Sequence, residues 1–122
     1  MRSFFMKSFI AVCLIGVLLY VFFGKRNDDI SDVLAQDNVL IIDVRSDAEV
    51  AQGMLKQAVH IPHTEITEQI QKHAQSKDQP IVLYCRSGGR AGHAKQALQS
   101  MGYTSVSNGG GYSSIKSYFS EK

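Results

Sequence analysis

The sequence predicts one α/β domain in three layers, a central parallel β-sheet with helices on both faces, preceded by an apolar N-terminal helix. Three observations lead to this fold class. Apolar runs of strand length alternate along the chain with segments of helical pattern. Residues 39–44 and 81–84 are almost continuously apolar, which is typical of strands buried on both faces of a parallel sheet. The length of 122 residues suits a single domain.

The elements of the first half follow from local signals. Ile30, Val33 and Leu34 fall on one face of a helix. Ser46 and Glu49 form a capping box, which begins a second short helix. The predicted elements are, in chain order, a helix at 30–34, a strand at 39–44, a helix between 46 and 53, and a strand at 58–62.

The second half continues the alternation. Ile66 and Ile70 are spaced i, i+4, as on a helix, and Pro80 precedes the most apolar strand. The next helix is rich in Ala and Leu and ends at Gly102, while three glycines at 109–111 predict a tight loop. The predicted elements are a helix at 64–74, a strand at 81–84, a loop at 85–89, a helix at 90–101, a strand at 104–107 and a helix at 112–119.

Charge and cysteine content exclude several classes of function. The chain has 13 basic and 11 acidic residues, and two of the basic ones, Arg2 and Lys7, precede residue 25. Residues 25–122 are therefore formally neutral and lack the clustered basic face that nucleic-acid binding needs, so we expect no nucleic-acid partner. Of the two cysteines, Cys13 and Cys85, only the second lies in this part, so it has no internal disulfide.

The N-terminal segment reads as a membrane anchor. Residues 9–23, FIAVCLIGVLLYVFF, are apolar apart from one glycine, and the run counted over residues 4–23 reaches the length of a bilayer-spanning helix. We predict that residues 1–24 are an anchor or signal segment, retained in the membrane, and that residues 25–122 are the globular domain. A cleaved signal peptide and a buried core helix are the alternatives.

The charges that flank this segment predict its orientation. Arg2, Lys7 and the terminal amine precede it, and Lys25 and Arg26 follow it. Because the more positive flank tends to stay in the cytoplasm, the excess of one charge favours a domain outside the cytoplasm, which is the periplasm in a bacterium. The opposite orientation, with the domain facing the cytoplasm, stays open.

The loop from Cys85 to Arg90, CRSGGR, carries the chemistry. Gly88 and Gly89 let the backbone curl so that several N–H groups point at one spot, next to the positive N-terminus of a helix. A thiol there has a stabilised thiolate, a lowered pKa and a raised reactivity. The pattern predicts that Cys85 is a catalytic nucleophile for an anionic substrate. The predicted substrate-binding residues are Arg86, Ser87, Gly88, Gly89 and Arg90, of which the arginines supply positive charge.

These residues resemble the rhodanese family, and specifically its single-domain sulfurtransferases. The resemblance covers nearly all of residues 29–119 and is most specific in the cysteine loop. It rests on Ile42, Asp43, Val44, Arg45, Glu49, Gly53, residues 58–62, residues 85–91, Gly102, Tyr103, Gly109 and Gly110. Three positions depart from the family pattern, which often has His at Met54, Asn at His60 and Trp at Tyr112.

The resemblance implies a reaction. The family's persulfide-forming cysteine falls on Cys85, and its substrate-cradling loop falls on residues 86–90. The thiolate would take the outer sulfur of thiosulfate or a similar donor, release sulfite, and pass the sulfur to cyanide or a thiol. The resemblance implies no metal and no organic cofactor. An anchored single domain is also similar to the periplasmic rhodaneses of bacteria.

Three other functions are alternatives for a cysteine loop of this kind. A sulfur relay between proteins would use Cys85 with little thiosulfate turnover. A cysteine-dependent phosphatase or arsenate reductase usually has five residues between its cysteine and arginine, whereas four separate Cys85 from Arg90. A thioredoxin-type enzyme needs a Cys-x-x-Cys pair, and position 88 is glycine.

The remaining polar residues point to structural roles. His60 and His63 lie close together, but too few ligands converge with them to predict a metal site. Asp43 and Arg45 end the first strand beside the cysteine loop. We interpret them as a structural ion pair or loop anchor, with Arg45 and Glu49 as one candidate pairing.

Overall fold

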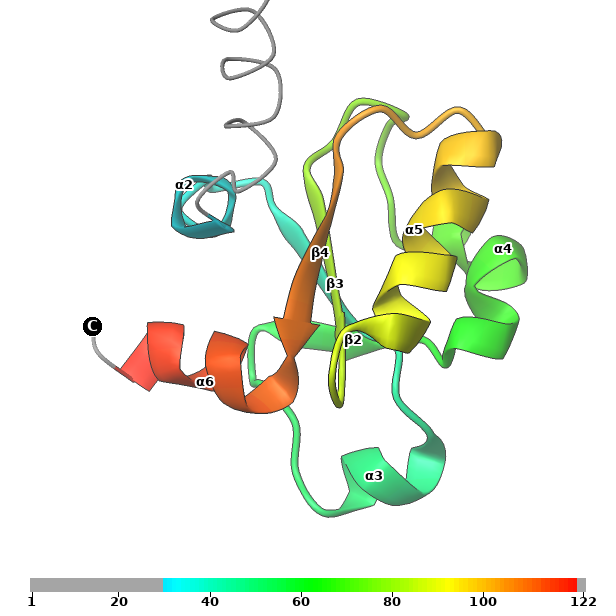
Figure 1. The fold of residues 1–122 in the computed structure, drawn as a ribbon. Helices are drawn as coiled ribbons and strands as arrows, with labels where there is room; N and C mark the ends of the chain where they lie inside the picture. The colour runs from blue at the N-terminus through cyan, green and yellow to red at the C-terminus, as the bar shows by residue number, and fades with distance from the viewer. Residues whose placement is uncertain (1–29, 121–122) are drawn as a thin grey trace, which may run out of the picture.

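A parallel sheet of four strands, in the order β2-β1-β3-β4, forms the centre of the computed structural model, which describes residues 30–120 (Figure 1). The strands are β1 (Leu40–Asp43), β2 (Ala58–His60), β3 (Ile81–Cys85) and β4 (Val106–Gly111). All three pairings between neighbouring strands are parallel, so β1 and β3 are the inner strands. The predicted α/β class with a parallel sheet is therefore confirmed.

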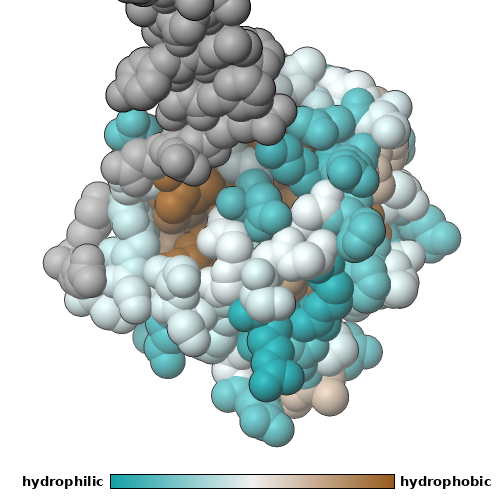
Figure 2. All heavy atoms as spheres, in the orientation of Figure 1, coloured by the Kyte–Doolittle hydropathy of each residue, from teal (hydrophilic) through white to brown (hydrophobic). Residues whose placement is uncertain are grey.

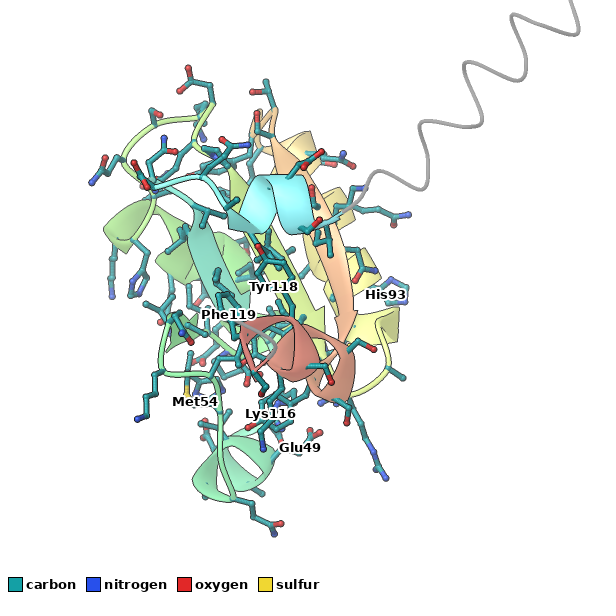
Figure 3. All side chains as sticks on the ribbon, turned by 90° about the vertical axis from the view of Figure 1, so that its left-hand side faces the viewer. Glu49, Met54, His93, Lys116, Tyr118 and Phe119 are labelled. Carbon is teal, nitrogen blue, oxygen red and sulfur yellow. The ribbon has the colours of Figure 1, made fainter. Side chains whose placement is uncertain are left out.

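Helices cover both faces of this sheet (Figure 1). One face carries α2 (Ile30–Leu34) and α6 (Tyr112–Ser120), and the other carries α4 (Ile66–Gln69) and α5 (Gly89–Ser100). The short helix α3 (Asp47–Ala51) lies beyond the carboxyl end of β1. The hydroxyl of Tyr118 on α6 donates a hydrogen bond to the carbonyl of Ser31 on α2, so the two helices of one face are joined (Figure 3).

Strand β3 divides the core in two, because successive side chains of a strand point to opposite faces. Ile81, Leu83 and Cys85 belong to the cluster of buried residues beneath α4 and α5. Val82 and Tyr84 belong to the cluster beneath α2 and α6. Every residue of β3 is buried, which explains why this strand has the most apolar sequence of the domain.

Residues 64–74 were expected to be helical, and they are helical as far as Lys72 but do not form one regular helix. The chain instead forms a 3₁₀ turn, η2 (His63–Glu65), then α4, then a second turn, η3 (Ile70–Lys72). Ile66 and Ile70 are the buried side chains of this segment, and no side chain caps α4 at its start. Two buried positions are too few to hold a longer regular helix against the sheet.

The glycine run at residues 109–111 is also not the expected loop, because it is the second half of β4. Gly111 pairs with Cys85, after an irregularity in the β3 register. A Cβ atom on Gly109 would lie 2.9 Å from the Cγ1 atom of Val82, and one on Gly111 would lie 2.6 Å from the carbonyl oxygen of Arg86. Glycine is therefore required here by close packing of the strand on its neighbours.

The predicted membrane anchor, residues 4–23, lies outside the described residues. Its predicted orientation therefore stays a prediction. Within residues 30–120, no helix is both long enough and apolar enough to span a bilayer. Figure 2 shows one face of the domain, where most of the described surface is hydrophilic and the apolar colour gathers near α2.

Candidate functional site

Cys85 ends β3 at the carboxyl edge of the sheet, where ligands of parallel α/β folds bind. The residue is buried, with 1% of its surface exposed. The main-chain N–H of Gly88 donates a hydrogen bond to its Sγ atom at 2.9 Å. Gly88 precedes α5 with a φ of 99°, in the left-handed region that favours glycine. This conformation turns the chain back over the thiol.

The loop around the thiol favours its ionised form. Burial alone would raise the pKa of Cys85, but the main-chain N–H groups of Ala91, Ser87, Gly88 and Arg90 oppose burial. Their combined effect is larger, so the pKa of this thiol lies below its ordinary value. A thiolate held by main-chain donors is a competent nucleophile, and the same donors can stabilise a negative product on the same sulfur.

Arg90 has an internal carboxylate partner. Its Nη1 and Nη2 atoms donate to the two carboxylate oxygens of Glu49 at 2.6 and 2.9 Å. These hydrogen bonds hold the pKa of Glu49 at about 2, and Ser46 adds to the effect through the predicted capping box. Glu49 raises the pKa of Arg90 in turn, and Cys85 raises it further. The guanidinium expected to bind an oxyanion therefore interacts with the Cys85 thiol and also has a compensating carboxylate.

The candidate pairing of Arg45 with Glu49 is wrong, because Arg45 binds Asp43. Nε and Nη2 of Arg45 donate to the Asp43 carboxylate at 2.7–3.0 Å. Nη2 also donates to the carbonyl of Gly53 at 2.6 Å, and the guanidinium lies 4.2 Å from the ring centroid of Tyr112. Asp43 is fully buried, so this pair is a structural anchor at the end of β1.

Asn108 is a site residue that the sequence did not reveal. Its Nδ2 atom donates to the carbonyl of Gly88 at 2.9 Å, and its Oδ1 atom accepts from the N–H of Gly110 at 2.9 Å. One side chain on β4 thus holds the cysteine loop and the glycine run together. Asparagine before glycine is a known turn signal, but that signal does not indicate a contact with a loop 20 residues earlier.

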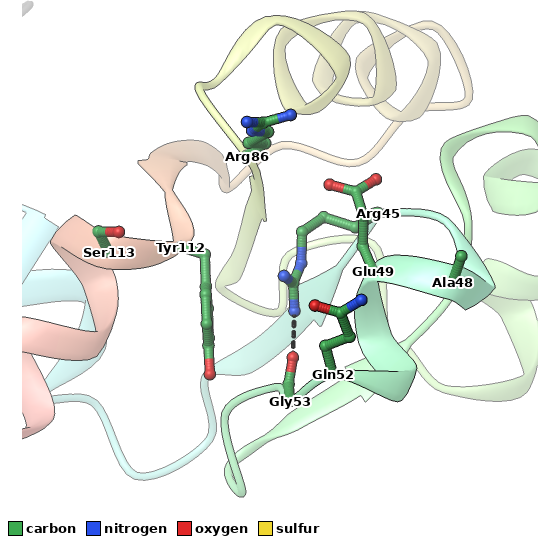
Figure 4. Close-up of a pocket in the computed structure, with 8 residues that line it drawn as sticks. All are labelled: Arg45, Ala48, Glu49, Gln52, Gly53, Arg86, Tyr112 and Ser113. Atoms are coloured by element: carbon green, nitrogen blue, oxygen red, sulfur yellow. Dashed lines mark hydrogen bonds between the residues drawn. The ribbon is translucent and has the colours of Figure 1, made fainter.

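Beside the cysteine loop lies a pocket of about 520 Å³, here called the α3–α6 pocket (Figure 4). It is lined by Arg45, Ala48, Glu49, Gln52, Gly53, Arg86, Tyr112 and Ser113. Arg86 and Ser87, the first residues of the loop after the cysteine, are both exposed, and Arg86 forms part of the pocket wall. The pocket therefore adjoins the loop that holds the thiol.

The histidines of the domain have other surroundings. The Nε2 atom of His60 lies 2.8 Å from the carbonyl oxygen of Arg45, and His93 is exposed on α5 (Figure 3). Within residues 30–120, no three or more His, Cys, Asp or Glu side chains gather in a way that could hold a metal ion.

Comparison with known proteins places this geometry in a family. The rhodanese-like domain model matches residues 27–118. The chain is 38% identical over 74 residues to the thiosulfate sulfurtransferase PspE of Escherichia coli, covering 61% of this chain and 71% of that protein. A solved structure described as a rhodanese with anions from E. coli is 36% identical, with a TM-score of 0.61, over 63% of this chain and 91% of that chain.

A longer protein also contains a similar stretch. A tRNA uridine(34) hydroxylase of Wolbachia pipientis is 33% identical over 79 residues, which are 62% of this chain and 28% of that protein. The family model, by contrast, spans most of the present chain and all the elements that hold the cysteine loop. The chain belongs to the rhodanese family.

Proposed function

We propose that this protein is a thiosulfate sulfurtransferase that carries a sulfur atom on Cys85. The observation that supports this most is the hydrogen bond from the Gly88 N–H to Sγ at 2.9 Å, in a loop that lowers the pKa of the thiol. An ionised thiol is required because the thiolate is the nucleophile. The likeness to a relative that is named a thiosulfate sulfurtransferase adds support.

The first half of the proposed reaction loads the enzyme. The Cys85 thiolate attacks the outer sulfur of thiosulfate, and a new S–S bond forms to Sγ. The S–S bond within thiosulfate breaks, and its electron pair leaves with sulfite. The product is a Cys85 persulfide anion, so total charge is conserved. The main-chain N–H groups that stabilise the thiolate also suit this anion.

The second half of the proposed reaction transfers the sulfur atom from the Cys85 persulfide to an acceptor. A thiolate or cyanide attacks the outer sulfur of the persulfide, and the electron pair of the breaking S–S bond returns to Sγ. No proton has to be removed by a side chain in either half, since both nucleophiles react as anions. The proposed tasks of residues 86–90 are to shape the amide cradle and to supply positive charge for anionic reactants.

Intact mass spectrometry after incubation with thiosulfate tests this proposal. The full-length Cys13→Ser variant leaves Cys85 as the one thiol of the chain. We expect it to gain one sulfur atom and to lose it again on addition of cyanide. The Cys13→Ser/Cys85→Ser double variant should gain nothing while keeping its far-UV circular dichroism spectrum. Failure of Cys13→Ser to gain a sulfur atom, or a gain by the double variant, would reject Cys85 as the carrier.

A protein-to-protein sulfur relay is the second candidate. The similar stretch within a longer tRNA uridine(34) hydroxylase supports it, because there the rhodanese-like sequence is only one part of a protein with another name. A relay would form the Cys85 persulfide from a protein donor and turn over thiosulfate poorly. Steady-state thiosulfate:cyanide transfer discriminates the two, since only the sulfurtransferase has sustained turnover with both small molecules.

The membrane anchor is a separate part of the proposal, and the sequence of residues 4–23 alone supports it. We expect the full-length protein to stay with the membrane fraction after alkaline carbonate washing, with the domain outside the cytoplasm. Protease added to intact spheroplasts should then digest the domain. Release of the protein by carbonate would reject a retained anchor, and digestion only after lysis would reverse the orientation.

A further inference from the structure

We infer that the α3–α6 pocket is the site of the sulfur acceptor, and that it selects small thiols that carry a carboxylate. This inference rests on the proposed function, because it concerns the second half of that reaction. It adds a binding site and a selectivity, and three properties of the pocket carry it: its size, its charge and its position beside the loop.

The size of the pocket exceeds what the sulfur donor needs. Its volume is about 520 Å³, within the range of pockets that bind organic ligands. Thiosulfate has only five heavy atoms and would fill a small part of this space. The rest of the pocket has room for a thiol of the size of an amino acid or a short peptide.

One side chain of the pocket wall carries a charge that no ion pair among the described residues neutralises. Arg45 and Glu49 both line the wall, but Asp43 neutralises the first and Arg90 neutralises the second. The guanidinium of Arg86 has no hydrogen bond or ion pair with any other residue of the described range 30–120, and Arg86 is exposed. The charge left for a ligand is therefore positive, and a carboxylate is the complementary group.

The neutral wall residues suit the remainder of such a ligand. Gln52, which directly follows α3, offers an amide, and Ser113 on α6 offers a hydroxyl from another part of the wall (Figure 4). The Tyr112 ring gives an apolar surface, fixed by the Arg45 guanidinium 4.2 Å away. Polar groups around one aromatic surface are typical of sites for small polar molecules.

The position of the pocket links it to the persulfide. Arg86 directly follows Cys85, and Glu49 binds Arg90 at the other end of the loop. A thiol whose carboxylate binds Arg86 is held next to the loop that carries the sulfur. Its thiolate then attacks the outer sulfur of the Cys85 persulfide. The persulfide S–S bond breaks, its electron pair returns to Sγ, and the acceptor leaves as a persulfide anion.

The test isolates this half of the reaction. Full-length protein is loaded with thiosulfate, freed of excess donor by gel filtration, and its persulfide content is measured by mass spectrometry. The loaded protein is then mixed with mercaptoacetate, 2-mercaptoethanol or cysteamine, which carry negative, neutral and positive groups beside the thiol. The rate of persulfide loss is compared between variant and wild type for each thiol, so that differences in thiol pKa cancel.

Removal of the positive charge should affect most strongly the two thiols that carry a second charged group. We expect Arg86→Gln to slow transfer to mercaptoacetate about tenfold, equivalent to about 1.4 kcal/mol, and to change transfer to 2-mercaptoethanol less than about twofold. Cysteamine should react faster than with wild type. Arg86→Lys should restore most of the mercaptoacetate rate, because it keeps the charge.

A second variant tests the pocket without touching the loop. Ser113→Asp places a negative charge on the opposite wall, near the start of α6, where an acidic side chain is compatible with the helix. We expect it to slow mercaptoacetate and to speed cysteamine. Lys72→Gln is the matched control, because it removes one exposed positive charge from η3, outside the pocket wall.

The outcomes separate the two proposals. If no persulfide forms, the proposed function fails. If the persulfide forms but Arg86→Gln and Ser113→Asp change all three thiols by the same factor, the acceptor site is wrong and the function stands. If Lys72→Gln has the same effect as Arg86→Gln, overall charge governs the rate, and the pocket has no role in selection.

Discussion

The guanidinium of Arg90 binds both carboxylate oxygens of Glu49, at 2.6 and 2.9 Å, and joins α5 to α3 across 41 residues of sequence. Glu49 is itself held by the Ser46 capping box, so the pair extends the local order of α3 to the cysteine loop. The contact lets the loop keep an arginine beside the thiol without an excess of positive charge there.

Glu49→Gln should reveal this ion pair through pH. The folded protein lowers the pKa of Glu49 from 4.5 to about 2, so the folded state favours the ionised carboxylate. The stabilisation is complete above the ordinary pKa and is lost as the pH falls toward about 2. We expect the difference in free energy of unfolding between wild type and variant, from urea titrations, to shrink over this interval. A difference that stays constant there would contradict the ion pair.

Gly88→Ala should raise the pKa of Cys85. Gly88 has a φ of 99°, and an added Cβ would lie 3.4 Å from the Cα atom of Gly110. A side chain in this region costs about 1–2 kcal/mol, and the loop can relax only by moving the N–H that binds Sγ. The pH dependence of iodoacetamide alkylation gives the thiol pKa, and thermal unfolding gives the stability.

Gly89→Ala is the control for that change. Gly89 is the first residue of α5, and no heavy atom lies within 4 Å of an added Cβ. We expect stability equal to wild type or slightly higher, since alanine favours the helix, and an unchanged alkylation profile. Equal shifts in both variants would mean that the left-handed turn at Gly88 has no special part in holding the thiolate.

Asn108→Ala should loosen the cysteine loop. The change removes the hydrogen bonds to Gly88 and Gly110 together, which predicts a loss of about 1–3 kcal/mol in the free energy of unfolding. The rate of persulfide formation with thiosulfate should fall as well, because the loop no longer has one fixed shape. Asn38→Ala, which removes an exposed asparagine before β1, should leave both quantities unchanged. A variant with wild-type kinetics would limit Asn108 to a structural role.

Gly111→Ala should be among the least tolerated changes in the domain. Its Cβ would lie 2.6 Å from the carbonyl oxygen of Arg86, a main-chain atom that cannot move without the loop. Overpacking of this kind costs about 1–3 kcal/mol. Gly92→Ala on α5, with its nearest neighbour at 3.5 Å, should cost nothing. Chemical denaturation of the two variants measures the difference, and equal midpoints would refute the close packing.

Much of the fold follows from local patterns in the sequence. The apolar run that contains β1, the Ser46 capping box and the buried β3 each depend on neighbours within a few residues, and each was predicted correctly. The loop between β3 and α5 was predicted for the same reason, because its glycines and the helix that follows lie in one short stretch.

The features that the sequence did not reveal depend on distant contacts. A glycine run reads as a loop unless one knows that Arg86 and Val82 press against it. Glu49 was expected to pair with Arg45, and its contact with Arg90 was missed because it joins positions 41 residues apart that meet only when α3 packs beside α5. The bonds of Asn108 were missed because they join a strand to a loop 20 residues away.

The glycines of β4 restrict how this enzyme can diversify. The glycines at 109–111 carry no side chains beside the cysteine loop, so this part of β4 offers no positions for tuning. Variation in substrate preference would have to arise at exposed positions around the thiol, such as Arg86 and the surrounding helices. An engineer who wishes to redirect the enzyme to a new recipient should therefore randomise the walls contributed by α3 and α6 and leave the sulfur carrier intact.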